Sequence, residues 1–349
     1  MAYTYNRTVT VDHTKVITSN QTNFPVLFNS TVAELATVAN GGHVTSDSGF
    51  DIIFSSSTDS ADKLDHEILK YVPATGEFIA QFRQPTLHTG SDDVIHILYG
   101  DGSVTTSQEN ITGTWSTNYK AVWHLKEPSG TIMDSTSNDN DSTTNSGLTY
   151  HAAGKNGYSV SSSGSGVILL PNNNFPSGAA IVTLQIWEKM AWNTNGGYLM
   201  GYGPIAGGAA AILYAEWNVD FLKFTQVGGN FATSGTVWNN EWHKISLEIN
   251  GSTAQQFYID GSPDTSGALT CNFDLSRSAY LLDSPDAGAK LPANIQEARV
   301  YAGLLGANWE ATEWNNQNSP SSFYQIGAEQ GSGGGGSTPH FSKNIAIFS

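Results

Sequence analysis

Residues 242–261 read Trp-His-Lys-Ile-Ser-Leu-Glu-Ile-Asn-Gly-Ser-Thr-Ala-Gln-Gln-Phe-Tyr-Ile-Asp-Gly. Apolar side chains alternate with polar ones from Ile245 to Asn250, and a Gly-Ser-Thr cluster separates this run from Gln256–Asp260. A period of two is typical of a β-strand with one buried face, and small polar clusters are typical of turns. The stretch therefore predicts two successive strands.

The same pattern recurs on both sides of this stretch. In the second half of the chain we expect further strands at 121–125, 181–187, 210–216, 221–227 and 294–301, and one helix at 309–316 with Asn308 as its N-cap. In the first half we expect strands at 8–17, 23–28, 50–54, 64–72, 76–83 and 93–99, and a short helix within 31–39. The spacing of the turn clusters favours antiparallel sandwiches. The predicted fold class is all-β, with two antiparallel, jelly-roll-like β-sandwich domains in series.

Length and composition divide the chain into three parts. A length of 349 residues suggests two domains, at about 150 residues per domain. We expect a first domain at 1–118, a second at 119–330, and a Gly-rich linker with a C-terminal arm at 331–349. The linker is natural or an engineered spacer, and the arm ends in an alternating run that is expected to dock on a partner or on its own domain.

Charge and cysteine content exclude several classes of function. The net charge is -16, with 31 acidic and 15 basic residues, so binding to nucleic acid or to anionic membranes is disfavoured. The single cysteine, Cys271, allows no intrachain disulfide and is expected to be a small buried apolar residue. The chain contains no apolar run of membrane-spanning length. The N-terminal residues do not form a signal peptide, so we expect either a removed signal or release by cell lysis, as for phage structural proteins.

Several segments of the second half carry a family resemblance. They are Ala121-Val-Trp-His-Leu125, Gly130–Asn138, Trp242–Leu247, Phe257–Gly261, Ile295–Val300 and Trp314–Pro320. Together they resemble a concanavalin A-like/laminin-G-like lectin domain. The resemblance implies two antiparallel sheets, sugar or protein binding at a rim or face, and core positions for Trp123, Trp187 and Trp242. Relatives often have Asp-Glu where this chain has Gln296-Glu297, which weakens an inherited cation site.

The first half carries a second resemblance. Phe24–Leu27, Gly49–Phe54, Leu64–Ile68 and Ile97–Asp101 resemble an uncharacterised bacterial and phage β domain that commonly precedes a laminin-G-like domain. That family supplies no site, and the resemblance implies a structural spacer or a docking module that acts as an anchor.

Tryptophans beside amides are the candidate carbohydrate-binding residues. Aromatic rings cover the apolar C–H faces of sugars, and neighbouring amides and carboxylates bind the hydroxyls. The candidates, expected in loops or at a rim, are Trp192, Asn193, Trp217, Trp238 and Asn240. The alternative for each tryptophan is burial in the core.

An oxygen-rich loop is the candidate metal site. Asp134, Asp139 and Asp141 lie close together in sequence with Asn138 and Asn140, and Glu297 approaches them if the fold follows the resemblance. Calcium prefers such hard oxygen ligands. The alternative is an ordinary turn stabilised by local hydrogen bonds. The histidines show no zinc-site spacing.

These observations predict a non-enzymatic, carbohydrate-binding surface protein. The Glu-x-Asp-x-x-Glu strand of concanavalin-like glycan hydrolases is absent, and sequence cannot show whether Asp65/Glu67 or Glu241/Glu248 converge on a cleft. We expect a phage virion component (decoration, fibre or tail protein) at a virion surface or outside a cell, displayed in several copies. Its expected partners are glycans or cell-surface polysaccharide, and other virion or surface subunits reached through the N-terminal domain or the arm. The alternatives are a structural assembly protein, a secreted bacterial adhesin and, last, a glycan hydrolase.

Overall fold

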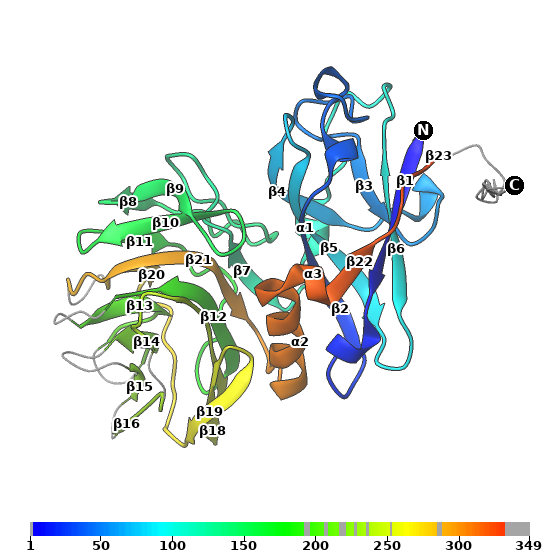
Figure 1. Cartoon of the computed structure of the whole chain (residues 1–349). Helices are drawn as coiled ribbons and strands as arrows, with labels where there is room; N and C mark the ends of the chain where they lie inside the picture. The colour runs from blue at the N-terminus through cyan, green and yellow to red at the C-terminus, as the bar shows by residue number, and fades with distance from the viewer. Residues whose placement is uncertain are drawn as a thin grey trace, which may run out of the picture.

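The chain folds into two β-sandwiches that lie side by side (Figure 1). The computed structural model describes residues 3–191, 196–205, 209–215, 221–226, 229–234, 237–251, 253–284 and 288–331. The predicted fold class, all-β with two antiparallel sandwiches in series, is confirmed.

The first sandwich consists of two small antiparallel sheets. One has the order β22-β1-β6-β3, with β23 also paired to β1, and the other has the order β2-β5-β4. Their N-terminal strands are β1 (Tyr5–Val11), β2 (Gln21–Thr31), β3 (Ile52–Ser55), β4 (His66–Val72), β5 (Glu77–Leu87) and β6 (Asp93–Tyr99). Phenylalanines fill the space between the sheets, and the ring of Phe54 stacks on that of Phe82 with centroids 4.4 Å apart.

The second sandwich consists of an eight-stranded and a seven-stranded sheet. The first has the order β19-β18-β17-β12-β21-β10-β9, with β7 also paired to β21, and the second has the order β16-β15-β14-β13-β20-β11-β8. The eight strands are β7 (Tyr119–Trp123), β9 (Thr149–Ala153), β10 (Tyr158–Ser163), β12 (Ile181–Lys189), β17 (Trp242–Asn250), β18 (Ala254–Ile259), β19 (Ser262–Gly267) and β21 (Pro292–Tyr301). The seven are β8 (Thr144–Ser146), β11 (Val167–Leu170), β13 (Gly197–Tyr202), β14 (Ala211–Ala215), β15 (Leu222–Gln226), β16 (Gly229–Ala232) and β20 (Ala279–Leu281).

The stretch 242–261 forms β17 and β18 as predicted. Leu247 of β17 faces Leu184 of β12 and Phe257 of β18 in the ladder, and all three side chains lie in the core. Their polar neighbours Lys244, Ser246 and Glu248 point to the opposite face of the sheet, because successive side chains alternate between the two faces.

The predicted end of the second domain is wrong, because residues 320–331 return to the first sandwich. Helix α2 (Ala307–Asn318) lies between the two sandwiches and α3 (Pro320–Phe323) follows it, and then β22 (Tyr324–Ile326) and β23 (Gln330–Gly331) pair with β1 (Figure 1). Trp309, Phe323 and Tyr324 enter the first core. Burial of these three rings in the first core stabilises the packing of this segment against the first sandwich.

Three local predictions are also corrected. The strand predicted at 8–17 ends at Val11, because the Asp12 side chain accepts a hydrogen bond from the Thr14 backbone N–H and starts a 3₁₀ turn at His13–Lys15. The helix predicted within 31–39 consists of two 3₁₀ turns, Ala33–Leu35 and Val38–Asn40. Gly306, rather than Asn308, is the N-cap of α2.

The remaining helical elements are short. Ser60–Asp62 forms another 3₁₀ turn, and α1 (Ile111–Thr114) precedes β7. Cys271 is buried, as predicted. None of the helices in the described ranges is long and apolar enough to cross a membrane. The predicted C-terminal arm beyond residue 331 lies outside the described residues.

Candidate functional site

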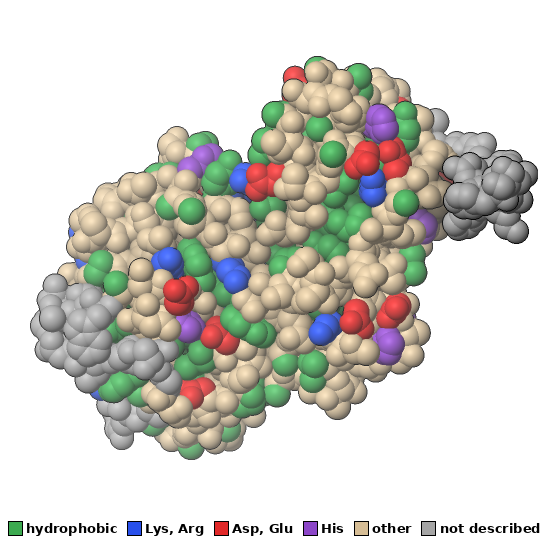
Figure 2. All heavy atoms as spheres, viewed as in Figure 1, with side chains coloured by type: hydrophobic (Ala, Val, Ile, Leu, Met, Phe, Trp, Pro, Cys, Tyr) green, Lys and Arg blue, Asp and Glu red, His purple; other side chains and the backbone are tan. Residues whose placement is uncertain are grey.

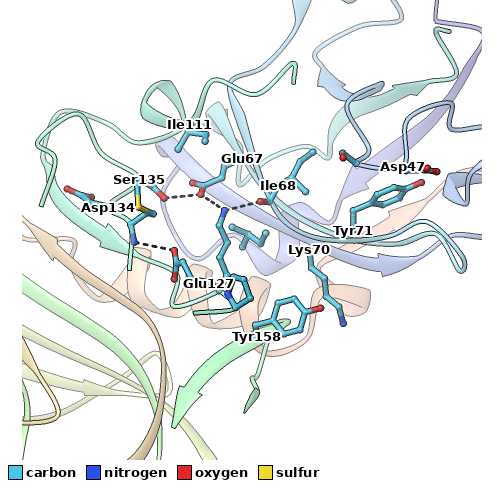
Figure 3. Close-up of a pocket in the computed structure, with 15 residues that line it drawn as sticks. Asp47, Glu67, Ile68, Lys70, Tyr71, Ile111, Glu127, Asp134, Ser135 and Tyr158 are labelled. Carbon is cyan, nitrogen blue, oxygen red and sulfur yellow. Dashed lines mark hydrogen bonds and ion pairs between the residues drawn. The ribbon is translucent and has the colours of Figure 1, made fainter. Parts of the chain in front are cut away.

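A cleft of about 660 Å³ lies between the two sandwiches (Figure 3). The first sandwich contributes β4, the turn at Asp47 and the helical turn at Ile111, and the second contributes the 126–135 segment and Tyr158 of β10. Figure 2 shows the surface hollowed between the two lobes, with acidic, basic and apolar side chains around the hollow. Neither sandwich forms this cleft alone.

Glu67 on β4 anchors the inner end of the cleft. Its carboxylate accepts hydrogen bonds from Lys126 Nζ at 2.7 Å and from the Ser135 hydroxyl at 2.9 Å, and Lys126 also donates to the Ile68 carbonyl at 2.9 Å (Figure 3). Lys126 and Ser135 belong to the second sandwich, so these bonds join the two walls. Glu67 is buried, and burial alone would raise its pKa, but His124 and Lys126 outweigh burial and hold the pKa well below its usual range.

Apolar side chains line the outer part of the cleft. Met133 is 50% exposed and Ile111 is 40% exposed, although both are large apolar residues. Tyr158 lies opposite β4, with the His151 ring stacked on it at a centroid distance of 3.9 Å and Lys70 Nζ 5.0 Å from its centroid. Exposed apolar groups gathered in a concave surface are typical of a binding site.

Glu127 supplies an acceptor in the same cleft. One carboxylate oxygen accepts the Met133 N–H at 3.2 Å, which holds the side chain in place. The other oxygen, Oε2, is shielded from bulk solvent and finds no hydrogen-bond partner among the described residues. A ligand hydroxyl would satisfy this oxygen once the Glu127 side chain turned toward the cleft.

A buried chain of alternating charges continues from the cleft into the domain interface. His124 lies between Glu67 and Glu297, with Nε2 3.1 Å from a Glu67 oxygen and Nδ1 2.5 Å from a Glu297 oxygen. Arg299 then bridges Glu297 and Glu313. Lys244 bridges Glu313 and Glu310, at 2.8 and 2.7 Å.

The ionised forms of His124 and Glu297 are stabilised by their neighbours. Burial lowers the pKa of His124, but Glu297 and Glu67 outweigh burial and raise the pKa to about 9. Burial raises the pKa of Glu297, but His124 and Arg299 outweigh burial and lower the pKa to about 2. His124 is therefore an imidazolium at neutral pH, and each of its ring nitrogens donates to a carboxylate.

Helix α2 covers the outer face of the eight-stranded sheet. Trp187 of β12 stacks on Trp314 of α2 with centroids 5.3 Å apart, and its indole N–H donates to Gln317 at 2.6 Å. Glu248 of β17 accepts the N–H groups of Leu305 and Gly306 at the start of the helix. The polar face of this sheet is therefore occupied by the protein's own chain.

The carboxylate pairs considered for catalysis do not converge in the described structure. Asp65 binds Arg83 and Asn110, whereas Glu67 binds His124 and Lys126. Glu248 caps α2 and is buried, whereas Glu241 is exposed.

The predicted calcium ligands are not gathered at one point among the described residues. The Asp134 carboxylate accepts the backbone N–H groups of Val122, Thr136 and Asn140 and the Thr136 hydroxyl, and Asp141 accepts the Asp134 N–H at 2.7 Å. Asp139 is exposed, and Glu297 binds His124 and Arg299. These contacts are those of the alternative, a hydrogen-bonded turn, and calcium binding stays a prediction.

Most of the predicted carbohydrate-binding residues lie away from the cleft or outside the described residues. Trp192, Asn193 and Trp217 are outside the described residues. Trp238 is only 3% exposed and belongs to the second core, so its predicted rim position is wrong, because the indole gains more from burial than from solvent. Asn240 is exposed at a left-handed turn with φ 64°.

Apart from Asp134, predicted as a metal ligand, the side chains of the cleft were not predicted from the sequence as binding residues. Glu67 lies within the strand segment Leu64–Ile68, and His124 lies within Ala121–Leu125. A titratable residue inside an apolar strand is a sequence signal of a buried ion pair. Charged residues are rarely buried without a partner, so each of them called for a counter-charge.

Comparison with known proteins supports the lectin-like fold of the second sandwich. A family described as the concanavalin A-like lectin/glucanases superfamily matches residues 162–309. The second sandwich is a concanavalin A-like domain. The first domain's resemblance to an uncharacterised β domain is not confirmed. No curated protein matches the sequence.

The solved structures that are similar to part of this chain have low sequence identity to it. The binding domain of Paraclostridial Mosquitocidal Protein 1 is 14% identical, with a TM-score of 0.47, over 56% of this chain and 52% of that one. The botulinum neurotoxin serotype D binding domain is 12% identical, with a TM-score of 0.45, over 57% and 52%. The serotype D ligand binding domain in complex with N-acetylneuraminic acid is 12% identical, with a TM-score of 0.47, over 57% and 51%. This chain spans about half the length of these structures.

Proposed function

We propose that the protein is a non-enzymatic carbohydrate-binding protein and that the cleft between its two sandwiches holds the sugar. The observation that carries the proposal is the combination of exposed apolar side chains and a shielded acceptor at one place. Met133 and Ile111 offer apolar surface to the C–H faces of a sugar. Glu127, whose Oε2 has no partner among the described residues, offers an acceptor to a hydroxyl when its side chain turns toward the ligand. Ligand sites generally combine an apolar lining with a few placed polar groups.

The family match supports the same class of ligand. The superfamily that matches residues 162–309 includes lectins and glucanases by its description. Lectins bind carbohydrate and glucanases hydrolyse it, so both recognise carbohydrate. The cleft adds a contribution from the first sandwich, because β4 forms one of its walls. In this proposal the N-terminal domain is half of the binding site as well as an anchor.

The buried ion pairs favour binding over hydrolysis. A glycoside hydrolase needs two carboxyl groups about 5–10 Å apart on either side of the scissile bond. Glu297 on the polar face of the sheet and Glu310 and Glu313 on α2 are all buried, and each is paired with a cation. Asp134, at the cleft, accepts four hydrogen bonds and is held as part of a turn.

The biological setting that we propose is a virion or cell surface. Weak, shallow sites gain avidity when many copies are displayed together. A phage decoration, fibre or tail protein would provide such display, and a secreted bacterial adhesin is the alternative setting. Other virion or surface subunits would bind the N-terminal domain or the C-terminal arm. The alternative function, an assembly protein without sugar binding, predicts that the cleft stays without a glycan ligand.

Glycan binding by the full chain and by charge variants tests the proposal. A glycan array identifies ligands, and biolayer interferometry then measures the affinity of the best one. Glu127→Gln should weaken binding at least about tenfold, since hydrogen bonds to charged groups contribute about 1.5–3 kcal/mol. Glu241→Gln removes the same charge from an exposed position outside the cleft and should bind as the wild type does. Absence of binding at every display density would favour the assembly protein.

A further inference from the structure

We infer that the cleft accepts uncharged saccharides and rejects saccharides that carry carboxylate or sulfate groups. This inference rests on the proposed function and names the class of sugar. The two lysines of the cleft are already paired with the protein's own carboxylates.

Both ammonium groups that line the cleft are bound to the protein's own acceptors. Lys126 Nζ lies 2.7 Å from Glu67 and donates a second hydrogen bond to the Ile68 carbonyl. Lys70 Nζ lies 2.7 Å from Glu77 and faces the Tyr158 ring. An acidic sugar would have to displace a carboxylate from one of these lysines.

The charge of the cleft and of the whole chain opposes an anion further. Asp47, Glu67, Glu127 and Asp134 line the cleft beside the two lysines. The formal charge of the protein is -16. An anion bound beside these carboxylates would be repelled, because like charges a few ångströms apart repel strongly in a site of low dielectric constant. Entry of an anion would also strip its hydration without a cation to replace it.

A neutral sugar avoids both obstacles and fits the remaining groups. Its hydroxyls donate, and Glu127, whose Oε2 has no partner among the described residues, accepts once its side chain turns toward the ligand. Its C–H faces match the exposed apolar surface of Met133 and Ile111. The ligand chemistry that this cleft recognises is therefore a set of hydroxyl donors on an uncharged, partly apolar ring.

Matched pairs of glycans test the selection. The probes are N-acetyllactosamine and its sialylated form, and a neutral galactose oligomer and the corresponding galacturonate oligomer, each immobilised at equal density. We expect the full-length protein to bind one or both neutral members at least about tenfold more tightly than their acidic partners. Equal or tighter binding of the acidic members would overturn the inference while leaving carbohydrate binding intact. No binding to any glycan of a full array would overturn the proposed function itself.

A charge variant tests the cause of the selection. Glu77→Gln releases the Lys70 ammonium, and Glu77 is partly exposed at the end of β5, so the fold should tolerate it. We expect this variant to gain affinity for the acidic probes and to keep its affinity for the neutral ones. Glu241→Gln makes the same change in net charge away from the cleft and should leave the preference unchanged. If both variants behaved alike, the local pairing of Lys70 would not be the cause.

Discussion

His124 of the second sandwich and Glu67 of the first form an ion pair across the domain interface, with Nε2 and the carboxylate oxygen 3.1 Å apart. Both side chains are almost completely buried, and His124 binds Glu297 through its other ring nitrogen. The pair lies directly beneath the cleft, because Glu67 also lines the cleft. Together with the bonds from Lys126 and Ser135 to Glu67, this contact joins the two walls of the cleft.

Replacement of His124 should destabilise the protein strongly. His124→Gln leaves two buried carboxylates without their shared cation, and loss of one partner of a buried ion pair costs about 3–5 kcal/mol. Urea unfolding measures the free energy of unfolding. His88→Gln is the matched control, because His88 pairs with Asp93 at the surface and should change the free energy by less than about 1 kcal/mol. Similar losses in both variants would contradict a special role for His124.

Stability should fall as the pH rises from about 6.5 to 9. The pKa of His124 is raised from 6.5 in the unfolded chain to about 9 in the folded protein, so the folded state binds more protons across this range. The stabilisation from His124 is complete below pH 6.5 and is lost as the pH passes 9. Thermal unfolding from pH 6 to 10 measures the effect. His124→Gln should flatten this part of the curve, and an unchanged curve would contradict the assignment.

Acid should destabilise the protein through the carboxylates of the same chain. The pKa of Glu297 is lowered from 4.5 to about 2, so its contribution is complete above pH 4.5 and is lost as the pH falls towards 2. Thermal unfolding between pH 5 and 2 should show falling stability in the wild type. The fall should be smaller in Glu297→Gln, and an equal fall in both proteins would contradict the ion-pair account.

Met133 should matter for binding and not for folding. Met133→Ala removes an apolar side chain that is half exposed in the cleft, so it should weaken glycan binding severalfold while the free energy of unfolding changes by less than about 1 kcal/mol. Leu304→Ala is the matched control, because Leu304 is 42% exposed outside the cleft. Biolayer interferometry and urea unfolding separate the two effects. Equal affinities in the two variants would argue against the cleft.

The Asp134 turn should be stable without calcium. Asp134→Ala removes four accepted hydrogen bonds and should lower the free energy of unfolding by about 1–3 kcal/mol or more, whereas Asp139→Ala, at an exposed position, should have little effect. Chelator should leave the melting temperature of the wild type unchanged. A fall in the melting temperature on chelation, restored by calcium, would support the predicted metal site instead.

The strands were predictable from sequence because their physical signal is local. Alternation in 242–250 follows from one buried face, and the structure places that strand at the predicted residues. The end of the second domain was not predictable in this way. Helix α2 buries the polar side chains of Glu310, Glu313, Asn316 and Gln317, so it carries no apolar stripe that would show where it packs.

The candidate site was not predictable for a related reason. Its walls come from residues 47–48, 67–71, 111, 126–128, 133–135 and 158, which are brought together only by the packing of two domains. Trp238 illustrates the opposite error, since a tryptophan beside an asparagine was predicted at a rim but lies in a loop that packs into the second core. Glu67 and His124 give the better signal, because a buried charge requires a partner elsewhere in the chain.

Hydrogen–deuterium exchange with a glycan selected on the array tests the central claim most directly. The account predicts slower exchange on ligand binding in both walls of the cleft, at residues 66–72 of β4 and at residues 126–135. The Glu127→Gln variant should show little of this protection at the same glycan concentration. Protection confined to the second sandwich away from residues 126–135, with β4 unchanged, would contradict a binding site between the two domains.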